Sequence, residues 1–311
     1  MTVQPVLEYA ESRWERSAPL PEVTAELLRG YLGPWPQLWG RPFRVLGGGL
    51  RSLNVEVHGL VARIAVDESA RRTLAKEAAL LERMRPRVRV PRLHDRSDDV
   101  LLLEHVAHVE LPDTERAGER AGRAAARIQA LRFARAGFLD AELAVPEPFA
   151  SAYDGLREWG EAGLRGVAGE RLGSCADRIR SLWDRHERPM RELGSEPVLT
   201  HSDFKPANVK WLPEEEDVLV LDWEFAWAGP ALFDLGMMLR WGASPGFVRG
   251  LARGYRDAGG VLPEGWRPLA ALLDLFNLVG MLDDATPRPI RDADLLRRVR
   301  ETLADHDARE R

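Results

Sequence analysis

Hydrophobic and polar positions follow different periods in three parts of the chain. In residues 1–40, two short stretches near 6–16 and 22–32 have helix-like spacing and are separated by prolines, which end helices. Residues 41–104 contain short apolar runs typical of strands, and residues 105–311 show mostly helical spacing. The pattern therefore predicts an α+β fold with an N-terminal helical extension, a small β-rich lobe and a larger, mostly helical lobe.

The predicted small lobe combines several strands with one helix. His58 and Gly59 lie between two β-like runs and indicate a tight hairpin. Further on, Asp67 to Ser69 can cap a helix that ends near Met84. The strands are expected at Phe43–Leu46, Leu53–Val57, Leu60–Val66, Val88–Val90 and Val100–Glu104.

The predicted helical lobe contains one β interlude. Helices are expected at Ala121–Leu131, Phe149–Glu161, Ser174–Leu193, Phe247–Ala258, Trp266–Leu282 and Asp292–Ala304. Between them, Val198–Thr200, Val209–Leu212 and Val218–Leu221 are short apolar strands. Asp222 follows the last strand directly. Polar residues at the ends of strands are where sites are commonly built, so we examine this interlude for chemistry.

Composition and charge restrict the class of protein. The 311 residues carry a net charge of −5, with 45% apolar and 30% charged side chains, which is ordinary for a globular protein. Nucleic acids and membrane surfaces attract basic proteins, so neither is expected as a partner. Cys175 is the only cysteine, which excludes an intramolecular disulfide and fits a cytoplasmic location. No apolar stretch approaches the roughly 20 residues of a membrane-spanning helix, and residues 1–10 lack the features of a secretory signal.

The loop His201–Asn208, with the sequence HSDFKPAN, brings an acid, an ammonium and an amide together. Phosphoryl transfer needs these groups, because its catalysis consists mainly of positioning and neutralising a highly charged group. Asp203 suits the acceptance of a proton from an attacking hydroxyl, and Lys205 suits contact with the phosphate. Asn208 and Asp222 offer the oxygen ligands that Mg²⁺ prefers. The full run, with an acid soon after it, favours phosphoryl transfer over an ordinary polar loop.

This loop resembles the catalytic loop of the protein-kinase-like fold, specifically that of the aminoglycoside phosphotransferase and choline kinase family. Asp222-Trp223-Glu224 resembles the metal-binding acid of this family with its neighbours, and residues 229–236 resemble its next motif. The likeness extends over residues 43–245, with dense motifs only in 198–236. It implies a two-lobed fold and transfer of phosphate from ATP or GTP to a small hydroxyl acceptor.

The resemblance also implies roles for individual residues. Asp203 corresponds to the catalytic base, and Asn208 and Asp222 correspond to magnesium ligands. Asp234 corresponds to an internal anchor of the catalytic loop, and His201 to a residue that shapes it.

The small lobe is expected to hold the nucleotide. Gly47, Gly48 and Gly49, followed by Ser52 and Asn54, resemble the loop that covers the phosphates in this family. Glycines in such a loop let backbone N–H groups approach phosphate closely. The strand that starts at Val100 resembles the one that leads to the hinge between the lobes. Adenine is therefore expected at the backbone from Glu104 to Val106.

A buried ion pair between Arg63 and Glu77 is also expected. In the predicted helix, Glu77 shares a face with apolar residues such as Leu74 and Leu81, so its carboxylate needs a partner. Arg63 shares a strand face with Val61 and is the candidate. The family normally has lysine here, so the sequence departs from its pattern, and arginine and lysine differ in geometry. The alternative is an exposed strand arginine with a helix-edge glutamate.

The acceptor is not identified by motif. Asp274, Asp283 and Asp284 offer charge for a cationic acceptor, although a solvated helix face is the simpler interpretation. The acceptor classes left open are aminoglycosides, choline or other amines, homoserine and sugars. A protein kinase is less favoured because Asp-Phe-Gly, Ala-Pro-Glu and a full G-x-G-x-x-G are lacking. A nucleotide-binding pseudokinase stays open, favoured only by Arg63.

Overall fold

A five-stranded antiparallel sheet forms the first part of the computed structural model, which describes residues 13–15, 22–46 and 52–309. The strands are β1 (Phe43–Val45), β2 (Ser52–Val57), β3 (Leu60–Ala65), β4 (Leu93–Arg96) and β5 (Val100–Glu104), in the spatial order β1-β2-β3-β5-β4. β2 and β3 form the predicted hairpin, in which Asn54 pairs with Arg63 across the strands. His58 at its turn has a positive φ of 52°.

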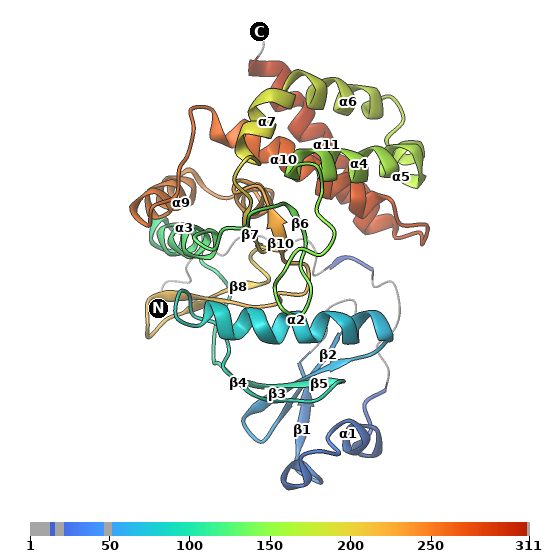
Figure 1. Cartoon of the computed structure of the whole chain (residues 1–311), viewed down its shortest axis with the longest axis vertical. Helices are drawn as coiled ribbons and strands as arrows, with labels where there is room; N and C mark the ends of the chain where they lie inside the picture. Colours follow the sequence, from blue (N-terminus) through green and yellow to red (C-terminus); the bar gives the residue numbers. More distant parts are fainter. Residues whose placement is uncertain (1–12, 16–21, 47–51, 310–311) are drawn as a thin grey trace.

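Both faces of this sheet are covered. Helix α1 (Ala25–Tyr31) and the 3₁₀ helix η2 (Pro36–Leu38) pack apolar side chains against one face, including Val55 and Ile64. Helix α2 (Glu68–Met84) covers the other face and lies between the sheet and the helical lobe (Figure 1). Asp67 caps α2 by accepting a hydrogen bond from the N–H of Ala70 at 2.7 Å, as predicted. The last four residues of β3, Ala62–Ala65, are all buried, as expected for a central strand whose sheet is covered on both faces.

The strand predicted at Val88–Val90 is wrong. Within that stretch only Arg89 forms an isolated bridge, to Leu219. The strand is β4, which begins five residues after Val88 and runs along the edge of the sheet. Three of its four residues are exposed, so it has no apolar run for a sequence pattern to detect.

Helices dominate the second lobe (Figure 1). They are α3 (Glu115–Gln129), α4 (Ala152–Arg165), α5 (Val167–Leu172), α6 (Cys175–Arg185), α7 (Glu187–Leu193), α8 (Phe233–Leu239), α9 (Pro245–Asp257), α10 (Trp266–Leu282) and α11 (Pro289–Arg309). The single helix predicted over Ser174–Leu193 is two helices, because the chain leaves helical geometry at His186. Of the helices predicted in residues 1–40, the second corresponds to α1, and the first lies mostly outside the described residues.

The β interlude divides into two small sheets. β7 (Val198–Thr200) pairs with β10 (Trp227–Gly229), which also pairs with β6 (Gly137–Phe138). β8 (Val209–Leu212) and β9 (Asp217–Val220) form a separate hairpin. The loop His201–Asn208 therefore connects one sheet to the other. β6 and β10 are too short to have been predicted from hydrophobic periodicity.

Helices α3 and α9 pack side by side at very short range (Figure 1). A Cβ atom added at Gly118 would lie 2.2 Å from the carbonyl oxygen of Phe247, and one at Gly122 would lie 2.0 Å from that of Leu251. Only glycine allows backbones to approach so closely. This packing brings Tyr255 of α9 to Gln129 of α3, and these two residues support the candidate site.

Candidate active site

The loop His201–Asn208 is held in shape by the buried side chain of His201. Its Nδ1 accepts a hydrogen bond from the N–H of Asp203 at 3.2 Å, and its Nε2 donates to the carbonyl oxygen of Leu221 at 3.0 Å. The imidazole thus ties the loop to the strand end that carries Asp222. Ser202 and Asp222 have positive φ values of 66° and 64°. Such values are strained for residues other than glycine and are maintained only where the surroundings impose them.

Asp234, at the start of α8, holds the backbone of the same loop. It is fully buried, and its two carboxylate oxygens accept the N–H groups of His201 and Ser202, both at 2.9 Å. Gln129 donates to Asp234 at 3.4 Å and to the carbonyl oxygen of Ala231 at 2.7 Å, and Tyr255 donates to Gln129 at 2.5 Å. Neither Gln129 nor Tyr255 could be assigned a role from the sequence, because no local pattern indicates that α3 and α9 meet beside Asp234.

Asp203, Lys205 and Asn208 form one cluster. One carboxylate oxygen of Asp203 lies 2.9 Å from the Lys205 ammonium, and the other accepts from the Asn208 amide at 2.6 Å. The Asn208 amide nitrogen also donates to the backbone oxygen of Asp203 at 3.0 Å. Because its nitrogen is turned toward Asp203, the amide oxygen is the atom left for a ligand.

The predicted ion pair between Arg63 and Glu77 is present and buried, with Nε 2.7 Å from the carboxylate. A terminal nitrogen of the same guanidinium lies 2.6 Å from Asp222 and 3.6 Å from Glu224. Burial would lower the pKa of Arg63, but the three carboxylates outweigh it and raise that pKa. The pKa of Asp222 is lowered, because Arg63 outweighs the effect of burial.

Glu224 is a member of this cluster that sequence reasoning missed. It is buried, and burial together with the nearby Asp222 carboxylate raises its pKa to about 8. Its sequence context gives no signal, because the packing of α2 against the segment after Asp222 creates its environment. Lys76 of α2 contributes to that packing by donating to the backbone oxygen of Ala226 at 3.0 Å.

Not all residues predicted for the nucleotide face the cleft. Gly48 and Gly49 lie outside the described residues. Asn54, Glu104 and Val106 line the cavity, whereas Ser52 is buried and does not. The Glu104 carboxylate is engaged by both terminal nitrogens of Arg89 at 3.0 Å, and the Val106 carbonyl accepts from His108 at 2.8 Å.

One cavity of about 1760 Å³ joins these groups. Its walls include Asn54, Arg63 and Glu104 from the small lobe. They also include Asp203, Lys205, Asn208 and Asp222; we call these four residues, together with Arg63 and Glu77, the catalytic edge. It continues to residues of α4, α10 and α11, and to Trp14 and Glu15, which the sequence did not indicate. Asp274 does not line this cavity: it is buried and paired with Arg240 at 2.7 Å.

Oxygen donors suited to a divalent cation meet at the catalytic edge. The Asp222 side chain retains 17% exposure and lines the cavity, as does Asn208. Among the described residues no group of three or more Asp, Glu, His or Cys side chains is arranged to hold a metal. The donor set is one carboxylate and one amide oxygen, hard ligands of the type that Mg²⁺ takes together with phosphate oxygens and water.

The two lobes and the cavity are those of a protein-kinase-like phosphotransferase. A model of the phosphotransferase enzyme family (APH) matches residues 42–272, well over half of the 311 residues. The chain belongs to this family. The expected family, fold class and enzyme class are therefore confirmed, and the roles of individual residues stay predictions.

Solved structures share this fold at low sequence identity. The GDP and kanamycin complex of APH(2″)-IIia is 17% identical, with a TM-score of 0.67 over 92% of this chain and 99% of that chain. Macrolide 2′-phosphotransferase MphH from Brachybacterium faecium is 18% identical, with a TM-score of 0.63 over 88% and 97% of the two chains. A putative fructosamine-3-kinase from Thermobifida fusca is 19% identical, with a TM-score of 0.65 over 91% and 100%.

Curated protein sequences give no match to this chain. Within the described ranges, no helix is both long enough and apolar enough to cross a membrane.

Proposed function

We propose that this protein transfers the γ-phosphate of ATP or GTP to a hydroxyl group of a small acceptor. The observation that carries the proposal is the Asp203 carboxylate, held at 2.9 Å from Lys205 and 2.6 Å from Asn208 on the same cavity as Asp222. An acid, an ammonium and two oxygen donors around one edge are what phosphoryl transfer requires.

Asp203 is proposed as the base. Its carboxylate lines the cavity, so an acceptor hydroxyl can approach it and give up its proton to the oxygen. Lys205 beside it carries positive charge toward the phosphate being transferred. His201 and Asp234 hold the loop backbone, so Asp203 needs little reorganisation when the acceptor binds.

Asn208 and Asp222 are the residues proposed to hold Mg²⁺. When bound, the ion supplies charge that neutralises the phosphate oxygens. Asp222 is suited to this role because Arg63 keeps its pKa low, so it is ionised at neutral pH. Arg63 in turn is fixed by Glu77, which limits how far it can move between Asp222 and a phosphate.

The small lobe, proposed as residues 41–104, is the nucleotide side. Asn54, Arg63 and the backbone from Glu104 to Val106 border the cavity there. The Gly47–Gly49 segment, with Ser52 next to it, is proposed to cover the phosphates. One similar fold is described as a GDP complex, which supports a purine nucleotide as donor.

Phosphate transfer from labelled ATP or GTP to a panel of amines, amino alcohols, sugars and aminoglycosides tests the proposal. Transfer is expected only with Mg²⁺. Asp203→Ala is expected to abolish transfer while leaving nucleotide binding largely intact, because the base contacts the acceptor rather than the nucleotide.

Two results would change the conclusion. Full transfer by the Asp203→Ala variant would overturn the mechanism. Nucleotide binding without transfer to any acceptor would favour a pseudokinase, an alternative supported by the direct contact of Arg63 with Asp222 at 2.6 Å.

A further inference from the structure

One part of the cavity is built by residues outside the family match. Trp14, Glu15, Asn277, Asp284, Arg288 and Arg291 line it, and we call these six residues the far end. All of them lie outside residues 42–272, the range shared with the family. They come from the segment 13–15, from α10 and the turn after it, and from α11; α10 and α11 belong to the helical lobe (Figure 1).

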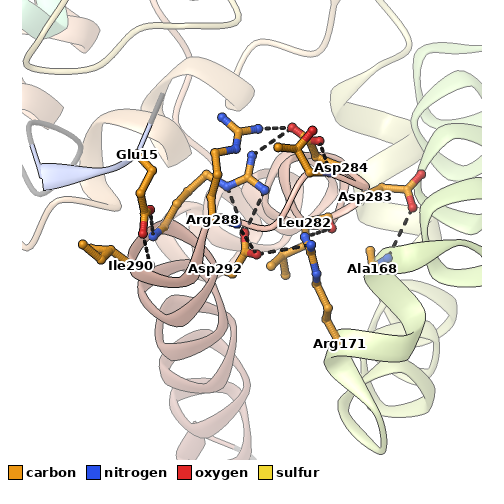
Figure 2. Close-up of polar contacts among 11 residues, drawn as sticks. Glu15, Ala168, Arg171, Leu282, Asp283, Asp284, Arg288, Ile290 and Asp292 are labelled. Carbon is orange, nitrogen blue, oxygen red and sulfur yellow. Dashed lines mark hydrogen bonds and ion pairs between the residues drawn. The ribbon is translucent and has the colours of Figure 1, made fainter. Parts of the chain in front are cut away.

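The charges at the far end neutralise one another (Figure 2). Arg288 and Arg291 pair with Asp284, Arg291 pairs with Asp292 at 2.7 Å, and Arg171 reaches Asp292 at 3.3 Å. The Glu15 carboxylate accepts the N–H groups of Ile290 and Arg291 at 2.8 and 3.1 Å. Within the six residues of the far end, two arginines, Arg288 and Arg291, stand against two carboxylates, Glu15 and Asp284, so these residues carry no net charge among themselves.

Few carboxylates remain for ammonium groups of an acceptor. Asp283 turns to the N–H of Ala168 at 3.2 Å (Figure 2) and does not line the cavity. Asp284 already accepts from two arginines and from the N–H of Thr286 at 2.9 Å. Within the described part of the chain, Glu158 on this cavity has no ion pair, and Glu15 accepts from two backbone N–H groups instead of pairing with a cationic side chain.

Hydrogen-bond donors, by contrast, are left over. The indole N–H of Trp14 and the Nε–H of Arg288 are buried and have no partner among the described residues. Both groups only donate, so each requires an acceptor atom. The Asn277 amide nitrogen is also buried and unpartnered there. Leaving a buried donor unpaired costs about 1–3 kcal/mol, so a ligand that supplies oxygen atoms here is favoured.

Aromatic side chains form the adjoining wall. Phe138, Phe149 and Trp227 all line the cavity, with ring centroids 5.4 to 6.3 Å apart. Phe138 is 67% exposed and Trp159, on the same cavity, is 44% exposed. Phe138 pairs across the sheet with Trp227, which in turn pairs with Thr200, the residue before His201. The aromatic wall therefore begins next to the catalytic loop.

Two helix glycines make room for these rings. A Cβ atom at Gly155 would lie 2.4 Å from the ring of Phe149, and one at Gly280 would lie 2.0 Å from the ring of Trp159. Glycine inside a helix costs about 1 kcal/mol relative to alanine. The helices accept this cost where an aromatic ring packs directly against their backbone.

From these features we infer that the acceptor is a neutral, polyhydroxylated ring compound, such as a sugar or oligosaccharide, and not a polycationic aminoglycoside. This inference rests on the proposed function and names its substrate class. The ring's C–H face packs on the aromatic wall, and its oxygens accept hydrogen bonds from Trp14 and Arg288. The charge balance at the far end leaves little attraction for several ammonium groups.

Equilibrium binding tests the inference without depending on transfer. Titrating the Mg²⁺ and non-hydrolysable ATP analogue complex with maltotriose and kanamycin, and with glucose and glucosamine, compares hydroxyl-rich and amine-rich probes. The hydroxyl-rich member of each pair is expected to bind at least about tenfold more tightly, a difference of about 1.4 kcal/mol. Tighter binding of the amine-rich members, or equal binding, would overturn the inference.

Two conservative variants test the donors. Trp14→Phe keeps a ring and removes the indole N–H, and Arg288→Lys keeps the charge and removes the Nε–H. Each is expected to weaken binding of the hydroxyl-rich probe about fivefold, the value of one neutral hydrogen bond, with nucleotide affinity unchanged. Trp183→Phe is the matched control, because Trp183 also has a buried, unpartnered indole N–H but does not line the cavity.

The outcomes separate this inference from the proposed function. Unchanged probe binding in both variants, with the fold intact by thermal melting, would overturn the inference whatever the transfer activity is. Absence of phosphate transfer to bound hydroxyl-rich probes would overturn the proposed function and leave the binding result standing.

Discussion

The two ends of the cavity differ in how their polar groups are satisfied. At the catalytic edge, Arg63 contacts Glu77 and Asp222, and Asp203 is held between Lys205 and Asn208. At the far end, buried donors lack a partner in the part of the chain that the structure describes. In the first region the charged side chains are paired with one another, whereas in the second buried donors are left without a partner among the described residues.

The regions also differ in their relation to the family. The catalytic edge lies within residues 42–272, which match the family, and the far end lies outside them. The two proposals thus assign the reaction to residues within the family match, and part of the choice of acceptor to residues outside it. If so, changes at the catalytic edge should lower transfer to every acceptor alike, whereas changes at the far end should alter only their ranking.

The largest effect is expected for Asp222→Asn. The amide keeps the size but loses the charge that pairs with Arg63 and is proposed to hold Mg²⁺, so transfer should fall about 10³-fold for any acceptor. Initial rates with two acceptors and the Mg²⁺ dependence of nucleotide binding measure this. Asp217→Asn, at the start of β9 and away from the cavity, is the control. Loss for one acceptor only would break the division between the two regions.

A smaller effect is expected for Asp234→Asn. Its amide nitrogen would face one of the two backbone N–H groups that the carboxylate now accepts, leaving a buried donor unpaired. The free energy of unfolding should fall by about 3 kcal/mol, and transfer should fall about 10²-fold, because the loop that positions Asp203 loosens. Thermal melts and kinetics check both values. The exposed Asp257, changed to Asn, should alter neither.

The sequence predicts the catalytic edge better than the far end for a physical reason. Asp203, Lys205 and Asn208 lie within one short loop, so their spacing alone indicates that they meet. Even the Arg63–Glu77 pair could be predicted, because each lies on an apolar face that demands a partner. Glu15, by contrast, meets Ile290 across 275 positions, and no local pattern signals that contact.

The same limit applies to the fold. Strands with an apolar face, such as β2 and β3, were predicted, and the exposed edge strand β4 was not. Helix positions were largely predictable, but the break between α6 and α7 was not. The sequence does not show that Asp284 lines the cavity and Asp274 does not. Only the structure shows that Asp274 is buried in an ion pair with Arg240.

A more moderate effect is expected for Arg63→Lys, which restores the residue usual in the family. Arg63 reaches Glu77 through Nε and Asp222 through a terminal nitrogen, and a single ammonium cannot hold both in this geometry. The KM for the nucleotide should change about tenfold, equally for all acceptors, with little change in their ranking. Arg71→Lys, in an exposed pair with Asp99 and away from the cavity, is the control. A changed acceptor ranking would contradict the separation of the two regions.

The last prediction concerns the free energy of unfolding rather than phosphate transfer, and it is made at Lys76, which donates to the segment after Asp222. Burial lowers the pKa of this lysine to about 8, against the attraction of Glu77 and Glu224. Because the pKa of Lys76 is lower in the folded state than in the unfolded state, the buried charge destabilises the native state at low pH. This destabilisation disappears as the pH rises above about 8 and the lysine loses its proton. Relative to the wild type, Lys76→Met should therefore be most stable near neutral pH. The difference in free energy of unfolding between the variant and the wild type should then fall by about 3 kcal/mol by about pH 10.

Thermal melts of the wild type and two variants across this pH range decide the point. Lys76→Arg is the matched control, because arginine stays charged throughout and cannot shed the cost. The methionine variant loses the hydrogen bond to Ala226 at every pH, so only the pH dependence of the difference is informative. If the difference in free energy of unfolding between Lys76→Met and the wild type does not vary with pH, the buried charge of Lys76 does not destabilise the native state, and the lowered pKa is contradicted.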